Sequence, residues 1–192
     1  IGPAVRAHHE SRAVRDRSGL AWLDADGDAG RAYLQDCAWA GLYARHNRAV
    51  LLQAGTSVLA DVLGAEPDES SLIACDHNHV RAEVHGGEPL WVHRKGAMHL
   101  PAGTAGILPG SMGTSTFHVE GRGNTEALCS SAHGAGRCLS RSEARRHIGV
   151  RKLLSEVSGV WFDHRLAAGL CEEAPSAYKD IGAVLRAQRD LV

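Results

Sequence analysis

The chain has 192 residues, a formal net charge of −1 at pH 7, 44% hydrophobic and 22% charged residues. These values are ordinary for a globular protein, and they exclude global charge as a means of attracting nucleic acid, so any such binding depends on local clusters. The sequence has no apolar run as long as a membrane span, and its five scattered cysteines form no CxxC pair, so we expect a soluble, cytoplasmic protein.

The expected elements begin with a long helix. After a polar, irregular stretch, apolar and small residues recur at three- and four-residue spacing from Ala29 to about Leu63. The middle third shows short apolar or alternating segments, which predict antiparallel strands at 71–75, 80–84, 90–93, 103–108 and 114–119. The last third predicts helices at 141–155 and 176–192. The expected fold class is therefore α+β, with antiparallel strands packed with helices and active-site turns between them.

Both ends of the chain look cut. It starts with Ile1 instead of Met, and it stops at Val192 within a helical pattern that has no closing glycine. We therefore expect residues 1–192 to be a single-domain fragment of a longer protein.

Two histidines follow the first predicted strand, in Asp76-His-Asn-His79. In a strand, His77 and His79 would point to the same face and could offer two nitrogen ligands to manganese, zinc or iron. His77 is the better candidate because Asp76 and Asn78 flank it and could orient it. Surface or core histidines remain the alternative.

Two further turns carry candidate phosphate contacts. In His93-Arg-Lys-Gly-Ala97, Arg94 offers a bidentate fork and Lys95 a point charge, although a solvated charge pair would have the same sequence. Pro109-Gly-Ser-Met-Gly113 is a small-residue turn after a strand and, taken alone, is simply a turn.

The most distinctive stretch runs from Leu128 to Arg137 and places His133 before a Gly-Ala-Gly turn. Glycines allow backbone amides to approach an anion, and a histidine there could donate a hydrogen bond, bind metal or attack phosphorus. A turn whose histidine merely bonds the backbone stays open as the alternative. The co-occurrence of these turns favours nucleotide or phosphoryl-transfer chemistry on a metal.

Five motifs in one order resemble the RtcB family of RNA-splicing ligases, from about residue 20 to the end. They are Cys75-Asp-His-Asn-His-Val80, His93-Arg-Lys-Gly-Ala97, Pro109-Gly-Ser-Met-Gly113, Ser130-Ser-Ala-His-Gly-Ala-Gly-Arg137 and Glu173-Ala-Pro-Ser-Ala-Tyr-Lys-Asp180. The resemblance implies an RtcB-like fold, of which this chain is the later half. It also implies a GTP- and manganese-dependent ligase that joins RNA 3′-phosphate (or 2′,3′-cyclic phosphate) to 5′-hydroxyl ends, in tRNA splicing or RNA repair.

Carried over by position, the resemblance makes His133 the nucleophile that attacks the α-phosphate of GTP and becomes guanylylated. His77 matches a manganese ligand. The implied guanylate pocket contains Pro109, Gly110, Ser111, Met112, Gly113, Ala135, Gly136 and Tyr178. From charge alone we add Arg94, Lys95 and Arg137 as contacts for phosphate or RNA.

The chain also departs from the family pattern. It lacks the Asp-x-x-Cys and Asn-His-Phe motifs, which supply most of the manganese ligands in the family, and it stops before the family's closing Lys-Gly. We therefore expect little activity from these residues alone. A non-catalytic nucleotide- or RNA-binding remnant and a metal-dependent phosphoesterase are the other readings. The sequence leaves open which RNA is joined and whether an activating protein partner is needed.

Overall fold

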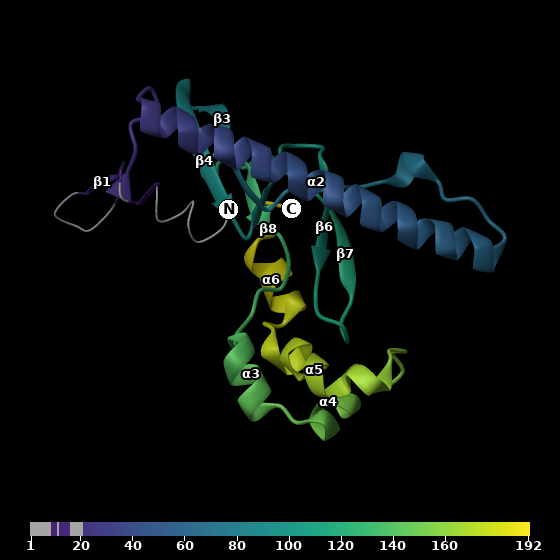
Figure 1. Cartoon of the computed structure of the whole chain (residues 1–192). Coiled ribbons are helices and arrows are strands. Elements are labelled where there is room, and N and C mark those ends of the chain that lie inside the picture. The colour runs from purple at the N-terminus through teal and green to yellow at the C-terminus, as the bar shows by residue number, and fades with distance from the viewer. Residues whose placement is uncertain (1–8, 11, 16–20) are drawn as a thin grey trace. The chain divides into compact units, whose positions relative to one another are not determined.

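The computed structural model describes residues 9–10, 12–15 and 21–192, and the chain divides into two compact units (Figure 1). Unit 1 comprises Ile1–Leu72, Asn78–Val84 and Pro89–His93. Unit 2 comprises Ile73–His77, His85–Glu88 and Arg94–Val192.

Unit 1 is dominated by α2 (Asp28–Leu63), an uninterrupted helix of 36 residues that confirms the prediction for 29–63 (Figure 1). It ends at Gly64, whose left-handed φ of 62° lets its N–H reach the carbonyl of Ala60 at 2.8 Å. Near its start, Gly30 is required, because a Cβ there would lie 1.9 Å from the carbonyl oxygen of Asp24. Two short strands, β1 (Val14–Arg15) and β2 (Ala21–Trp22), pair antiparallel in the same unit.

The predicted hairpin at 80–93 is confirmed and is longer than expected. Strands β3 (Asn78–His85) and β4 (Glu88–Lys95) form a two-stranded sheet. Gly86 and Gly87 connect them with φ values of 60° and 87°, the positive values that a tight two-residue hairpin turn demands.

The strand predicted at 71–75 is wrong. The segment Glu69–Ser71 is a 3₁₀ turn, η1, because the Asp68 carboxylate accepts the Ser70 N–H at 3.0 Å and turns the chain. Residues 72–77 are irregular. The apolar run reflects packing instead, since Cys75 lies against a core cluster of unit 2.

Unit 2 contains two small antiparallel sheets. Strands β6 (Ala105–Pro109) and β7 (Thr116–Glu120) confirm the predictions at 103–108 and 114–119 with shifted ends. Strands β5 (Ala97–His99) and β8 (Ser130–Ala132) were not predicted. They have three residues each, which is too short for an alternating pattern to stand out.

The first C-terminal helix is in fact two helices. Strand-like angles at Ile148 (φ −113°, ψ 108°) separate α3 (Arg141–His147) from α4 (Val150–Glu156), so one helix over 141–155 is wrong. After η2 (His164–Leu166), α5 (Ala167–Leu170) and η3 (Cys171–Glu173), the chain forms another short turn.

The helix predicted at 176–192 is also wrong at both ends, because only Ile181–Ala187 is α-helical. Pro175–Ala177 is a 3₁₀ turn, η4, and Tyr178 is extended. Helix α6 (Ile181–Ala187) begins only after Asp180, whose carboxylate accepts the Gly182 N–H at 2.9 Å.

Two apolar clusters form the core of unit 2, and the side chain of Tyr178 packs against both. The first joins the C-terminal helices and turns through Ala144, Ile148, Leu153, Val157, Ala167, Cys171, Ala174 and Ala177. The second joins the strands to α6 through Met98, Leu100, Leu108, Ala135 and Ile181. The architecture is thus α+β with antiparallel strands, as expected. Within the described residues, no helix has both the length and the apolar character needed to cross a bilayer.

Candidate functional site

All of the predicted site residues lie in unit 2. His133 directly follows β8, and its Nδ1 lies 2.5 Å from the carbonyl oxygen of Gly96. A carbonyl only accepts, so Nδ1 must carry the proton and donate it. In the neutral imidazole the lone pair is then on Nε2, which is the form a nucleophile needs.

Gly96 also connects His133 to His77. The Gly96 N–H donates to the carbonyl oxygen of His77 at 2.7 Å, and the two imidazole rings stack with centroids 4.7 Å apart. Gly96 has a φ of 74°, and a Cβ there would lie 3.4 Å from Cε1 of His133. The glycine therefore permits both the turn and the close approach of the ring. Because β3 begins only at Asn78, the strand argument that paired His77 with His79 does not apply.

The turn at 109–113 adjoins the Gly-Ala-Gly segment after His133. The Ala135 N–H donates to the carbonyl oxygen of Pro109 at 2.9 Å, and a Cβ on Gly134 would lie 3.0 Å from that oxygen. Within the turn, the Ser111 N–H donates to the hydroxyl of Thr114 at 2.6 Å. Two predicted pocket segments are therefore in contact.

The far side of this turn is closed by the segment that leads to Tyr178. A Cβ on Gly113 would lie 2.7 Å from Cγ of Pro175 and 2.9 Å from the carbonyl oxygen of Glu156, so glycine is required. Gly110 is required as well, because its Cβ would lie 2.2 Å from the Thr114 hydroxyl. The side chain of Met112 packs against the first core cluster.

Tyr178 lies beside the segment that follows His133. It forms an antiparallel bridge with Arg137, and the Lys179 N–H donates to the carbonyl oxygen of Gly136 at 3.0 Å. A chain of backbone contacts thus links His133, the turn at 109–113, the segment 134–137 and Tyr178.

The Arg137 guanidinium is bound within the chain. Its Nη1 donates to the Tyr178 hydroxyl at 3.0 Å and to the Glu173 carboxylate at 3.2 Å, and its Nε donates to the carbonyl oxygen of Leu139 at 3.0 Å. The guanidinium also lies over the Tyr178 ring, 4.8 Å from its centroid. These contacts fix the loop that follows His133 to the C-terminal segment.

This network shifts two pKa values in opposite directions. Partial burial and the hydrogen bond to Glu173 raise the pKa of Tyr178. Burial acts to raise the pKa of Glu173, but the Tyr178 hydroxyl and the charges of Arg137 and Arg141 outweigh it and leave that pKa below its ordinary value.

The two adjacent cations of the second motif have different surroundings. Arg94 is 4% exposed; its Nε donates to the Ser130 hydroxyl at 2.9 Å and its Nη2 to the carbonyl oxygen of Leu128 at 2.6 Å. Lys95 is exposed. Of the two, Lys95 presents its charge to solvent, where a phosphate could reach it.

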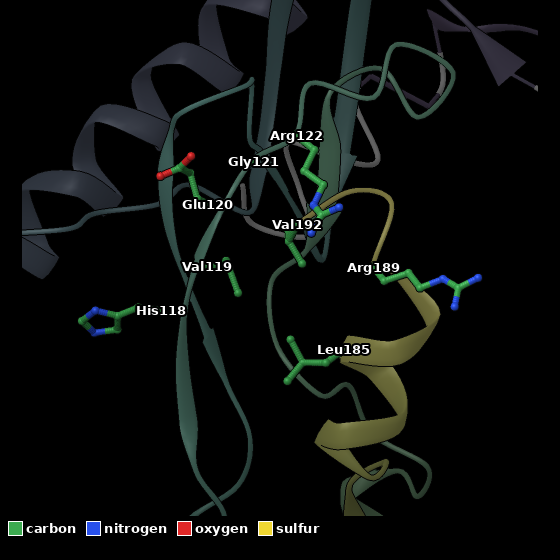
Figure 2. A pocket seen from close by; sticks show the side chains of 8 residues that line it. All are labelled: His118, Val119, Glu120, Gly121, Arg122, Leu185, Arg189 and Val192. Carbon is green, nitrogen blue, oxygen red and sulfur yellow. The ribbon is translucent and has the colours of Figure 1, made fainter.

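Unit 2 also has a groove of about 430 Å³ at the end of β7, away from the predicted residues. Figure 2 shows β7 and the residues after it on one side of this groove, with Leu185 of α6 and Arg189, which follows that helix, on the other. Its lining residues are His118, Val119, Glu120, Gly121, Arg122, Leu185, Arg189 and Val192. None of them is a predicted site residue.

The family model described as tRNA-splicing ligase RtcB matches residues 4–192. The chain belongs to the RtcB family. It is 41% identical over 165 residues to RNA-splicing ligase RtcB1 of Escherichia coli, a match that covers 83% of this chain and 40% of that protein. It is 36% identical over 194 residues to RNA-splicing ligase RtcB of Mycobacterium tuberculosis, covering 91% and 44%. The chain therefore spans about two fifths of the length of these curated relatives.

The manganese site implied by the RtcB resemblance is not complete in the described part of the chain. His77 offers one imidazole beside His133, but the described residues contain no group of three or more His, Cys, Asp or Glu side chains that could hold a metal ion. The described residues alone do not fit the metal.

Sequence reasoning missed three supporting residues in this RtcB chain. Gly96 acts through its backbone, which no residue type reveals. Glu173 stands in a recognised motif, but its role became visible only through its contact with Tyr178. Gln188 is 5% exposed, and its Oε1 accepts the N–H of Ala132, the residue before His133, at 2.9 Å. Gln188 and Ala132 are 56 residues apart along the chain, so no local pattern relates them.

Proposed function

We propose that the protein containing this chain is an RNA ligase that uses GTP and manganese to join RNA 3′-phosphate or 2′,3′-cyclic phosphate ends to 5′-hydroxyl ends. The observation that carries the proposal is the bond from His133 Nδ1 to the carbonyl oxygen of Gly96, which places the lone pair of the neutral imidazole on Nε2 in an RtcB-family chain. RNA is the expected partner, in tRNA splicing or RNA repair, and the chain forms the later half of an RtcB-like fold.

In the first step, Nε2 of His133 donates its lone pair to the α-phosphorus of GTP. The N–P bond forms while the bond from phosphorus to the bridging oxygen breaks, and pyrophosphate leaves with that electron pair. The Gly96 carbonyl keeps the proton on Nδ1 and stabilises the positive charge that develops on the ring. An oxygen of the RNA 3′-phosphate then attacks the guanylate phosphorus, while the N–P bond breaks and its electron pair returns to Nε2. The 5′-hydroxyl oxygen next attacks the activated 3′-phosphate, its proton passes to water, and GMP leaves with the electron pair of the broken P–O bond. A 2′,3′-cyclic phosphate is opened by water to the 3′-phosphate before these steps.

The remaining predicted residues have supporting roles in this proposal. The turn at 109–113, Ala135, Gly136 and Tyr178 would bind the guanylate. Lys95 would contact phosphate, because its charge is exposed. His77 would contribute one ligand to manganese, which supplies Lewis-acid polarisation of phosphoryl oxygens when bound.

The test is covalent labelling of the intact protein with GTP that carries ³²P at its α-phosphate, in the presence of manganese. We expect one label on the denatured protein that is stable to alkali and lost in acid, as a phosphoramidate requires. His133→Ala should abolish it. His118→Ala, an exposed histidine of β7, is the matched control and should keep it.

Label retained in His133→Ala would disprove the assignment. A wild-type protein that binds RNA or GTP but takes no label would instead identify a non-catalytic binding protein.

A further inference from the structure

We propose that Arg94 is a positioning residue for His133, acting on the turn that leads into β8, and that it does not contact phosphate. The inference rests on the proposed function only in taking His133 as the reactive group. Its evidence is the contacts of the Arg94 guanidinium, which the sequence could not reveal.

The Arg94 guanidinium is buried and bonded within the chain. Arg94 is 4% exposed, and two of its donors are engaged by Leu128 and Ser130, at 2.6 and 2.9 Å. An incoming phosphate would have to displace these internal bonds and enter the packed interior of unit 2. The planar guanidinium instead supplies a fixed pair of donors to one turn.

The turn that Arg94 contacts has an unusual backbone conformation. Leu128 and Cys129 are consecutive non-glycine residues with left-handed φ values of 51° and 48°. Such a pair is strained and persists only where surrounding contacts hold it. Arg94 binds the carbonyl oxygen of Leu128, while the carbonyl oxygen of Cys129 accepts the Leu100 N–H at 2.7 Å.

Strand β8 connects this turn to His133. The segment 94–99 contacts the segment 128–133 at three successive points. Arg94 donates to the turn before β8, β5 pairs with β8, and the Gly96 carbonyl oxygen accepts from His133 after β8. A turn that relaxes would move β8 and lengthen the 2.5 Å contact between Nδ1 and Gly96. The ring would then no longer be held in the tautomer that leaves Nε2 free.

The chain offers a matched control in the next residue. Arg94→Met and Lys95→Met remove the same charge from adjacent positions, one buried and one exposed. A third variant, Arg94→Lys, keeps the charge but loses the rigid pair of donors.

The measurement is the tautomer of His133 in the intact, substrate-free protein at fixed pH, from long-range ¹H–¹⁵N spectra with histidine labelled and assigned through His133→Ala. In wild type and Lys95→Met we expect a protonated Nδ1. Arg94→Met and Arg94→Lys should give a mixture of tautomers. The guanylylation rate at saturating GTP should fall about 10- to 100-fold in both Arg94 variants, the size typical of a misplaced reacting group.

Ser130→Ala removes the acceptor of the Arg94 Nε bond without changing charge, so it serves if Arg94→Met does not fold. We expect the same tautomer shift, but smaller. An unchanged His133 spectrum in Arg94→Lys and Ser130→Ala, with loss of apparent affinity for phosphate-bearing ends in Arg94→Lys, would overturn the proposal. Because the spectrum needs no GTP, it decides the positioning role even if the labelling test fails.

Discussion

The two units use apolar side chains in opposite ways. Of the 36 described residues of α2 in unit 1, only Gly30 is buried, while Trp39, Tyr43 and Val62 are 67%, 62% and 76% exposed. In unit 2, Leu108 and Leu153 are fully buried. Among the residues that the structure describes, every buried hydrophobic residue except Val92 belongs to unit 2.

The difference shows that helical periodicity and core formation are separate properties. The spacing in α2 predicts a helix, and the helix is present. Because it buries almost no side chain within the described residues, the contributions that stabilise it there are its backbone hydrogen bonds and the helix propensities of its residues. Unit 2 buries its apolar groups, and it also carries all of the predicted site residues. A site that depends on a 2.5 Å contact needs such a packed support.

The largest expected effect is on stability, and it comes from making the same leucine-to-alanine substitution at a buried and at an exposed position. Leu153→Ala empties a fully buried position in the first core cluster and should lower the free energy of unfolding by about 2–5 kcal/mol. Leu51→Ala, at a position of α2 that is 64% exposed, should change it by less than about 0.5 kcal/mol. Urea unfolding of the intact protein measures both.

A loss in Leu51→Ala as large as that in Leu153→Ala would contradict this contrast. It would mean that the apolar surface of α2 is covered in solution.

The next effect concerns how the helices begin. Helix α3 starts with a capping box: the Ser140 hydroxyl accepts the Glu143 N–H at 3.2 Å, and the Glu143 carboxylate accepts the Ser140 N–H at 2.8 Å. Helix α2 starts after Gly27, which has no side chain to cap it. Ser140→Ala should therefore cost about 1 kcal/mol in the free energy of unfolding.

The control for this prediction is Ser155→Ala. Ser155 lies inside α4, is exposed and donates only to the carbonyl oxygen of Lys152, so alanine there should be neutral or slightly stabilising. Equal effects of the two substitutions would show that the capping bonds do not matter.

The sequence predicts well where local physics decides. The period of α2, the Gly86-Gly87 hairpin and the order of the motifs are each visible within a few residues. It fails where distant partners decide: β5 and β8 pair across about 30 residues, and the end of α3 at Ile148 interrupts a pattern that suits a continuous helix. The acceptors of the Arg94 guanidinium lie 34 and 36 residues away along the chain, so its charge alone could not reveal them. The tautomer of His133 likewise depends on a carbonyl 37 residues away.

The smallest expected effect is the acid response of unit 2. The pKa of Glu173 is lowered in the folded chain by Tyr178, Arg137 and Arg141, against the opposing effect of burial. A lowered pKa stabilises the fold above the unfolded value of 4.5, and this contribution disappears as the pH falls through the folded pKa. Glu173→Gln should therefore be less stable than wild type by less than about 1 kcal/mol at pH 7, and the difference should shrink as the pH falls below 4.5.

Tyr33→Phe in unit 1 is the control, because burial raises the pKa of Tyr33 to about 12 and its hydroxyl does not titrate in acid. The difference in unfolding free energy between Tyr33→Phe and wild type should stay constant from pH 7 to below pH 4.5. If the difference between Glu173→Gln and wild type also stayed constant over that range, the ion pairs of Glu173 would make no pH-dependent contribution to stability.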